Sequence, residues 1–259
     1  MTKILAIANQ KGGVGKTTTS VNLAASLAAA KRRVLLIDLD PQGNATTGSG
    51  INKSELRQTV YHALLESHQL ADVRQTAAQG GYDVIPANRE LAGAEVELVD
   101  EEHREQRLRN ALQPIAQEYD YILIDCPPAL SLLTLNGLVA AQSVMIPMQC
   151  EYYALEGLSD LVNTVKKVRA NLNPQLEIEG LLRTMFDPRN ALAQQVSDQL
   201  QRHFGDKVYS TVIPRNIRLA EAPSYGKPVL FYDRASKGAL AYVALAGEFL
   251  QRREGVAAV

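Results

Sequence analysis

The chain has 259 residues, 46% of them hydrophobic, with no tryptophan, two cysteines and a formal net charge of −1. Two cysteines without a C-x-x-C motif argue against a disulfide framework, a zinc site or an iron–sulfur cluster. The near-zero charge provides no general attraction to nucleic acid or to an anionic membrane, so DNA binding would require a local patch of cations. No apolar run reaches the roughly twenty residues of a membrane-spanning helix, and no cleavable signal fits at the start, which favours a cytoplasmic protein.

Apolar runs alternate with stretches of helical periodicity along the whole chain. We predict strands over residues 3–8, 33–38, 82–86, 121–125, 143–147, 177–186 and 207–212. We predict helices over residues 17–30, 102–117, 132–141, 154–171, 191–204 and 236–253. This alternation is typical of an α/β fold, a doubly wound and mainly parallel sheet with helices on both faces. Because no linker or repeat divides the sequence, we expect a single domain over residues 1–259, without an N-terminal helix-turn-helix extension.

A glycine-rich turn lies between the first predicted strand and the first predicted helix. Its glycines permit backbone angles that a Cβ would forbid and let amide groups converge on an anion. Lys16 can reach the β- and γ-phosphates of a nucleotide, and the Thr17 hydroxyl can bind Mg²⁺. The helix that begins near Thr17 directs its positive dipole end to the same point. The turn therefore predicts a site for a nucleoside triphosphate, made of Lys11, Gly12, Gly13, Val14, Gly15, Lys16, Thr17 and Thr18.

Two later strands end in aspartates that should lie beside this turn, because ligands bind beyond the carboxyl ends of parallel strands. Asp125 follows four mostly apolar residues in the Walker B layout and is predicted to hold Mg²⁺, directly or through water. Asp38 is predicted to support the loop and the Mg²⁺ shell. Asp40, at the turn before Pro41, is the candidate that positions the attacking water, since phosphoryl transfer depends on an in-line nucleophile. The alternative for Asp38 and Asp40 is a simple strand-end cap.

Four segments together carry a family resemblance. The phosphate loop has Gln10 where the usual pattern has its first glycine, and it has a second lysine, Lys11. The other segments read D-L-D-P-Q-G-N-A-T after the second strand, I-D-C-P-P after the fourth, and P-R-N-I-R-L-A-E-A-P-S-Y-G-K-P at residues 214–228. The chain resembles the ParA/Soj chromosome- or plasmid-partition ATPases of the ParA/MinD superfamily, from residue 3 to about residue 249.

The resemblance implies a mechanism. ATP with Mg²⁺ would create a sandwich dimer in which Lys11 reaches the nucleotide of the other subunit; the alternative is that Lys11 contacts its own phosphates or solvent. Pro214 and Asn216 would lie near the adenine and ribose, and Asp40 would position the water for a weak intrinsic ATPase. The dimer would bind double-stranded DNA of the nucleoid without sequence preference. A ParB/Spo0J-type centromere-binding partner would stimulate hydrolysis and so release the DNA.

The sequence offers modest support for the DNA step. Residues 183–237 contain nine Lys or Arg but five Asp or Glu, although the whole chain is slightly acidic. Such a patch binds phosphates without reading bases, and a dimer doubles it. Arg189 and Arg218 are the leading candidates for DNA contacts, and Arg215 is a candidate for nucleotide or DNA. The alternative is that these cations only solvate the surface.

Two other functions remain open at this point. A MinD-like membrane-associated ATPase would need an amphipathic helix that buries apolar residues in lipid. Residues 239–253 are amphipathic, but we expect their apolar side chains to pack on the sheet: Leu240, Val243, Ala246, Phe249 and Leu250. A small-molecule kinase or synthetase would need an acceptor site, and no residue constellation indicates one. We expect the carboxylates of residues 95–105 to form a solvated face, not a metal site.

Overall fold

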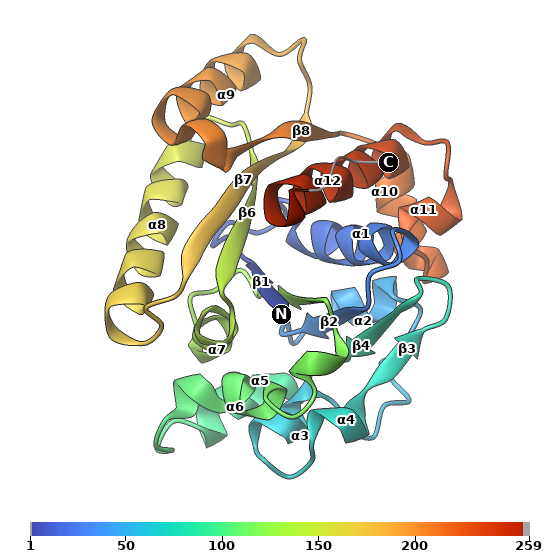
Figure 1. Cartoon of the computed structure of the whole chain (residues 1–259), viewed down its shortest axis with the longest axis vertical. Coiled ribbons are helices and arrows are strands. Elements are labelled where there is room, and N and C mark those ends of the chain that lie inside the picture. The colour runs from blue at the N-terminus through green and yellow to red at the C-terminus, as the bar shows by residue number, and fades with distance from the viewer. Residues whose placement is uncertain (1, 256–259) are drawn as a thin grey trace.

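The structure, a computed structural model, describes residues 2–255 as a twisted sheet covered by helices on both faces (Figure 1). In these residues the sheet has eight strands in the order β3-β4-β2-β5-β1-β6-β7-β8. All neighbours pair in parallel except β3 and β4. This confirms the predicted doubly wound α/β fold. The strands are β1 Lys3–Ile7, β2 Val34–Asp38, β3 Gln75–Ala77, β4 Tyr82–Ile85, β5 Tyr121–Asp125, β6 Ser143–Gln149, β7 Glu177–Phe186 and β8 Val208–Pro214.

The central strands are buried on both faces, so their side chains divide between two cores with the period of two that a strand imposes. In β1, Leu5 and Ile7 belong to the core beneath α1 and α12, whereas Ala6 belongs to the opposite core. Figure 1 shows α1, α11 and α12 on one face and α3, α6 and α7 on the other. The main helices are α1 Lys16–Ala29, α2 Asn44–Gly48, α3 Val60–Leu64, α4 Leu70–Val73, α5 Leu91–Glu97, α6 Arg107–Leu112, α7 Leu132–Ala140, α8 Ala154–Asn171, α9 Ala191–Phe204, α10 Ile217–Glu221, α11 Val229–Tyr232 and α12 Lys237–Glu254.

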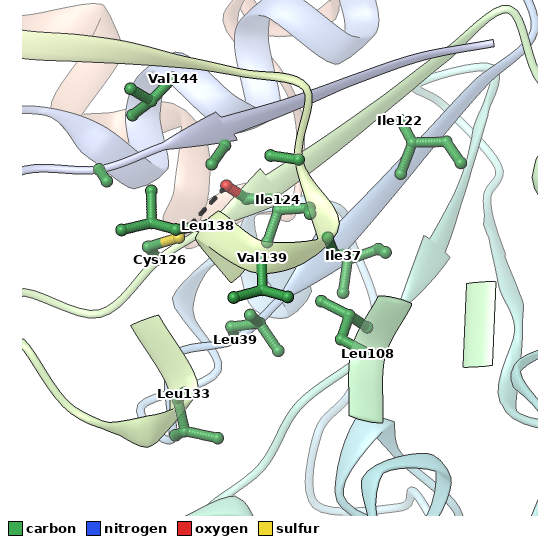
Figure 2. Packing of buried hydrophobic residues seen from close by; sticks show 14 of the residues in the cluster. Ile37, Leu39, Leu108, Ile122, Ile124, Cys126, Leu133, Leu138, Val139 and Val144 are labelled. Carbon is green, nitrogen blue, oxygen red and sulfur yellow. Dashed lines mark hydrogen bonds between the residues drawn. The ribbon is translucent and has the colours of Figure 1, made fainter. Parts of the chain in front are cut away.

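The core between β5 and α7 is packed tightly around Cys126 (Figure 2). The Cys126 thiol lies 3.9 Å from the Ile124 carbonyl oxygen, and burial raises its pKa, so it is an unreactive core residue. A Cβ at Gly137 of α7 would lie 2.8 Å from the Cys126 sulfur. Glycine is therefore required for this close approach of helix to strand, which holds the end of β5 in place.

The predicted helix over residues 102–117 is wrong, because the structure divides it. The segment contains a 3₁₀ turn at Arg104–Gln106, α6 at Arg107–Leu112, and a second 3₁₀ turn at Ala116–Glu118. Pro114 has no N–H to donate, so the helical hydrogen-bond ladder cannot continue through it, although Gln113 keeps helical angles.

Two other expectations need correction. The prediction did not include β3, an antiparallel edge strand of three residues, two of them exposed, whose pattern is too short to be seen in sequence. In α12, Ala246 and Phe249 are buried as expected, but Leu240 and Val243 are 58% and 45% exposed. They lie on the outer face of the helix, not on the sheet. None of the helices within residues 2–255 combines the length and apolarity that a bilayer-spanning segment needs.

Candidate functional site

The turn between β1 and α1 has the backbone of an anion-binding loop. Gly13 and Gly15 have φ of 73° and 87°, in the left-handed region that disfavours a side chain. Gly12 lies outside that region, and no atom is within 4 Å of where its Cβ would be, so the expectation of unusual angles is wrong for Gly12. The Lys11 amide donates to the Asn9 side-chain oxygen at 2.9 Å. Helix α1 begins at Lys16, one residue earlier than predicted.

Side chains from the neighbouring strands hold this loop, although the sequence pattern did not indicate them. Thr184 of β7, which is 2% exposed, donates to the Val14 carbonyl oxygen at 2.7 Å. Gln149, the last residue of β6, donates to the Gly13 carbonyl oxygen at 3.1 Å. Both residues lie near the carboxyl ends of predicted strands, and this position could have indicated their role. However, the strand predicted over residues 143–147 ends two residues before Gln149, the true end of β6.

Lys16 lies beneath the loop and is only 7% exposed. Its ammonium donates to the Lys11 carbonyl oxygen at 3.1 Å, inside the loop. Burial lowers the pKa of Lys16, and the nearby Asp125 carboxylate acts against that shift. A cation held in this way is available to phosphate oxygens as they enter the loop.

Asp38 and Asp125 end neighbouring strands, pair in register, and are fully buried. The Asp38 carboxylate accepts three hydrogen bonds: two from Thr46, at 2.8 Å from the amide and 2.7 Å from the hydroxyl, and one from the Asp40 amide at 3.1 Å. Asp38 therefore ties the start of α2 to the end of β2. Asp125 accepts from the Ser20 hydroxyl at 2.8 Å through one oxygen only.

The second carboxylate oxygen of Asp125 is buried without a hydrogen-bond partner in the described part of the chain. A buried, unpartnered carboxylate oxygen is costly unless a cation completes it. The Thr17 hydroxyl also interacts with Asp125. Hydroxyl and carboxylate oxygens are the hard donors that Mg²⁺ prefers, so Thr17 and Asp125 fit this metal well. The oxygens of Asp38 are already engaged, so a supporting role suits Asp38 better than direct binding of the metal.

Burial, and to a lesser degree neighbouring carboxylates, raise the pKa of both acids. The pKa of Asp38 rises to about 6, mainly because of burial. The hydrogen bonds from Thr46 act in the opposite direction and lower this pKa. The pKa of Asp125 rises to about 7, first through burial and then through the charge of Asp38. Asp40, which is half-buried, lies just beyond the strand and accepts from the Gln42 amide at 2.9 Å.

These shifts predict how the stability of the metal-free protein depends on pH. Since both folded-state values exceed the ordinary value of about 4, the folded chain holds more protons than the unfolded chain between roughly pH 4 and pH 7. The free energy of unfolding should therefore fall as pH rises through this range. We expect Asp125→Asn in EDTA to stabilise the protein at pH 8 by on the order of 2 kcal/mol, or roughly 4–8 °C. Thermal unfolding of the wild type and of Asp125→Asn, measured from pH 5 to pH 8, tests this. If the unfolding temperature changed with pH equally in both proteins, the prediction would be contradicted.

A cavity of about 210 Å³ adjoins the phosphate loop, where Gly15 and Thr18 form one wall. Pro214, the last residue of β8, and Asn216 form another wall. That they lie near the adenine and ribose stays a prediction of the resemblance. The Asn216 side-chain oxygen is buried and has no hydrogen-bond partner in the described residues. An amino group of a bound ligand could satisfy it.

The three candidate DNA-binding arginines differ in their surroundings. Arg189 is 88% exposed but forms a two-point ion pair with Asp187, at 2.8 and 3.0 Å. Arg218 of α10 contacts Glu221 at 2.8 Å and Asp233 at 3.2 Å. Arg215 is exposed, lines the cavity, and has no ion pair within residues 2–255. The charge of Arg189 and of Arg218 is thus partly offset by carboxylates that lie near them.

Sequence comparisons find close relatives over nearly the whole chain. Residues 2–178 match a family profile described as an AAA domain. The chain is 65% identical over 253 residues to an uncharacterized protein of Pseudomonas putida, covering 98% of this chain and 96% of that protein. It is 58% identical to the sporulation initiation inhibitor protein Soj of Bacillus subtilis (96% and 98% covered). It is 54% identical to the chromosome partitioning protein ParA of Myxococcus xanthus (96% and 88% covered).

Solved structures share the fold. A cobyrinic acid a,c-diamide synthase from Mycobacterium smegmatis, with bound ADP and magnesium, is 37% identical with a TM-score of 0.85, covering 99% of this chain and 97% of the other. The septum site-determining protein MinD of Pyrococcus horikoshii, complexed with Mg-ADP, is 26% identical with a TM-score of 0.76, covering 96% of both chains.

Proposed function

The chain belongs to the ParA/Soj family of chromosome-partitioning proteins, and from this premise we propose that its ATP-bound dimer binds DNA and that ATP hydrolysis releases it. The chain is a partitioning ATPase, its nucleotide is ATP and its metal is Mg²⁺. The proposed functional unit is a single domain. The observation that carries the proposal is the convergence of Lys16, Thr17 and the unpartnered oxygen of Asp125 beneath one anion-binding loop.

The proposed chemistry follows from this arrangement. Lys16 binds the phosphates, and Thr17 and Asp125 hold the metal, which would neutralise charge that develops on the phosphoryl oxygens. Asp40 accepts a hydrogen bond from the attacking water and aligns it with the γ-phosphate. Pro214 and Asn216 contact the adenine and ribose in the adjoining cavity. Asp38 positions the Asp40 loop through its bonds to Thr46 and to the Asp40 amide.

Two subunits would close over two nucleotides, and Lys11 of each would reach the nucleotide of the other. The Lys11 side chain is 47% exposed and so accessible from outside its own subunit, which supports this role. The dimer brings two DNA-binding patches together, so ATP controls DNA affinity through dimerisation. A ParB/Spo0J-type centromere-binding protein would stimulate the weak intrinsic hydrolysis, and the protein would be found on the nucleoid in the cytoplasm.

We expect Arg218→Glu to lower DNA affinity by about tenfold or more at 0.1 M salt. The substitution reverses a charge in each subunit and places three carboxylates together, with Glu221 and Asp233, which repel phosphates. A gel shift with ATP measures the loss, and light scattering should show that the variant still dimerises. Arg169→Glu, an exposed arginine in the last turn of α8, is the matched control. Unchanged DNA binding by the Arg218 variant would exclude a contact by that residue.

The proposed function as a whole is tested by DNA retention with ATP, ADP and no nucleotide across a salt series. We expect retention only with ATP, and a steep fall as salt rises. Equal retention in all three states would overturn the link between nucleotide and DNA.

An ATP-dependent synthetase is the second candidate, because a structure with that name is 37% identical over nearly the whole chain. A synthetase uses ATP together with its acceptor, whereas the proposed partition ATPase hydrolyses ATP slowly by itself and retains DNA when ATP is bound. Phosphate release and DNA retention with ATP, both in the absence of any small acceptor, separate the two functions.

A further inference from the structure

The carboxyl end of β6 contacts the phosphate loop at two points. Gln149 donates to the Gly13 carbonyl oxygen at 3.1 Å, and Glu151 forms an ion pair with Lys11, 2.5 Å between the carboxylate and the ammonium. We call residues 149–153 the β6 clasp. This segment contains Gln149, Glu151 and the two tyrosines that follow. The Lys11 that the proposed dimer needs is thus bound to a carboxylate of its own subunit.

The two tyrosines of the β6 clasp face solvent. Tyr152 and Tyr153 are 74% and 71% exposed, and their rings meet edge to face with centroids 5.0 Å apart. Exposed aromatic side chains are enriched in protein interfaces relative to the rest of a surface. Because the tyrosines follow Glu151 directly, a surface that covers them also reaches the ion pair. A second copy of this chain is the partner, because in the proposed function Lys11 acts across a dimer.

We propose that Glu151 is a positioning residue that holds Lys11 within its own subunit until a second copy covers the β6 clasp. The inference rests on the proposed function, in which Lys11 acts across the dimer. One ammonium group cannot bind a carboxylate of its own subunit and a phosphate of the other subunit with full strength. The ion pair between Glu151 and Lys11 therefore opens when the dimer forms, and it opens twice in each dimer.

The exposure of the pair determines how strongly it can oppose dimerisation. The side chains are 47% and 52% exposed, so solvent screens the interaction. Such a pair changes an equilibrium constant by about 1.4- to 5-fold. Two pairs open in one dimer, so the effect multiplies to roughly 2- to 30-fold. This is strong enough to suppress dimerisation at low protein concentration and weak enough for bound ATP to overcome.

The first test is dimerisation of Glu151→Gln with a non-hydrolysable ATP analogue, measured by sedimentation equilibrium at low salt. We expect the dimer dissociation constant to fall by roughly 2- to 30-fold, and the difference from wild type to vanish near 1 M salt, where the screening length is about 3 Å. Glu156→Gln is the matched control, because Glu156 is an exposed carboxylate in the first turn of α8 with no ion pair in the described part of the chain. It should dimerise as the wild type does.

The second test needs no dimer. An amine-reactive reagent with mass spectrometry measures the labelling rate of Lys11 in the nucleotide-free protein, together with the temperature of unfolding. Glu151→Gln should label Lys11 faster at an unchanged unfolding temperature, and Glu156→Gln should not. If the wild type dimerises but Glu151→Gln dimerises no more tightly, or if Lys11 labelling is unchanged, the inference is overturned while the proposed function stands. A wild type that stays monomeric with the analogue overturns the proposed function and the inference with it.

Discussion

Replacing Lys16 by alanine is expected to lower the affinity for ATP by roughly 10- to 100-fold. The Lys16 ammonium is buried beneath the phosphate loop, and a charge-assisted hydrogen bond at such a site contributes about 1.5–3 kcal/mol. The substitution also removes the cation next to Asp125, so the phosphates would meet a buried carboxylate with no opposing lysine. Titration calorimetry with ATP and Mg²⁺ measures the change.

The Lys16 experiment needs a control for stability, because the variant removes a buried side chain. Lys166→Ala, an exposed position on α8, removes the same charge far along the chain and should leave ATP binding unchanged. Circular dichroism should show that the Lys16 variant remains folded. An affinity for ATP within threefold of wild type would refute the assignment of the loop.

The second large effect is expected for Asp40→Ala, which should slow ATP hydrolysis by about 10²- to 10⁴-fold while ATP still binds. The proposed role of Asp40 is to accept a hydrogen bond from the attacking water, which alanine cannot do. Since we propose that the dimer dissociates after hydrolysis, the variant should accumulate as an ATP-bound dimer. Phosphate release and light scattering with ATP measure the two consequences.

Asp40→Asn separates the chemical role of this residue from a structural one. Asparagine can still accept the hydrogen bond from the Gln42 amide, which the Asp40 side chain accepts at 2.9 Å. If Asp40 only caps the end of β2, the asparagine variant should hydrolyse ATP normally. If Asp40 positions the water with its charge, both variants should be slow. A monomer of Asp40→Ala in the presence of ATP would count against the proposed role.

Some parts of the site could be predicted from the sequence, and others could not. The phosphate loop was predictable because glycine adopts left-handed backbone angles easily, as Gly13 and Gly15 do here. The aspartates could be placed beside the loop because parallel strands bring their carboxyl ends to one edge, as the registered pair of Asp38 and Asp125 shows. The role of Asp38 could be predicted only in part, because its hydrogen-bond partner Thr46 lies on a short helix that the sequence pattern did not predict.

The sequence by itself therefore indicated the α/β alternation, the anion-binding loop and the family, because the residues that carry each of them lie in short continuous segments. Only the tertiary structure decided how these parts are held: Thr184 reaches Val14 across 170 positions and Glu151 reaches Lys11 across 140. It also decided that Asp233, which is distant from Arg218 in the sequence, contacts that arginine and partly neutralises it. The physical reason is that charge and hydrogen-bond partners depend on distance in space, and a linear pattern records distance only along the chain.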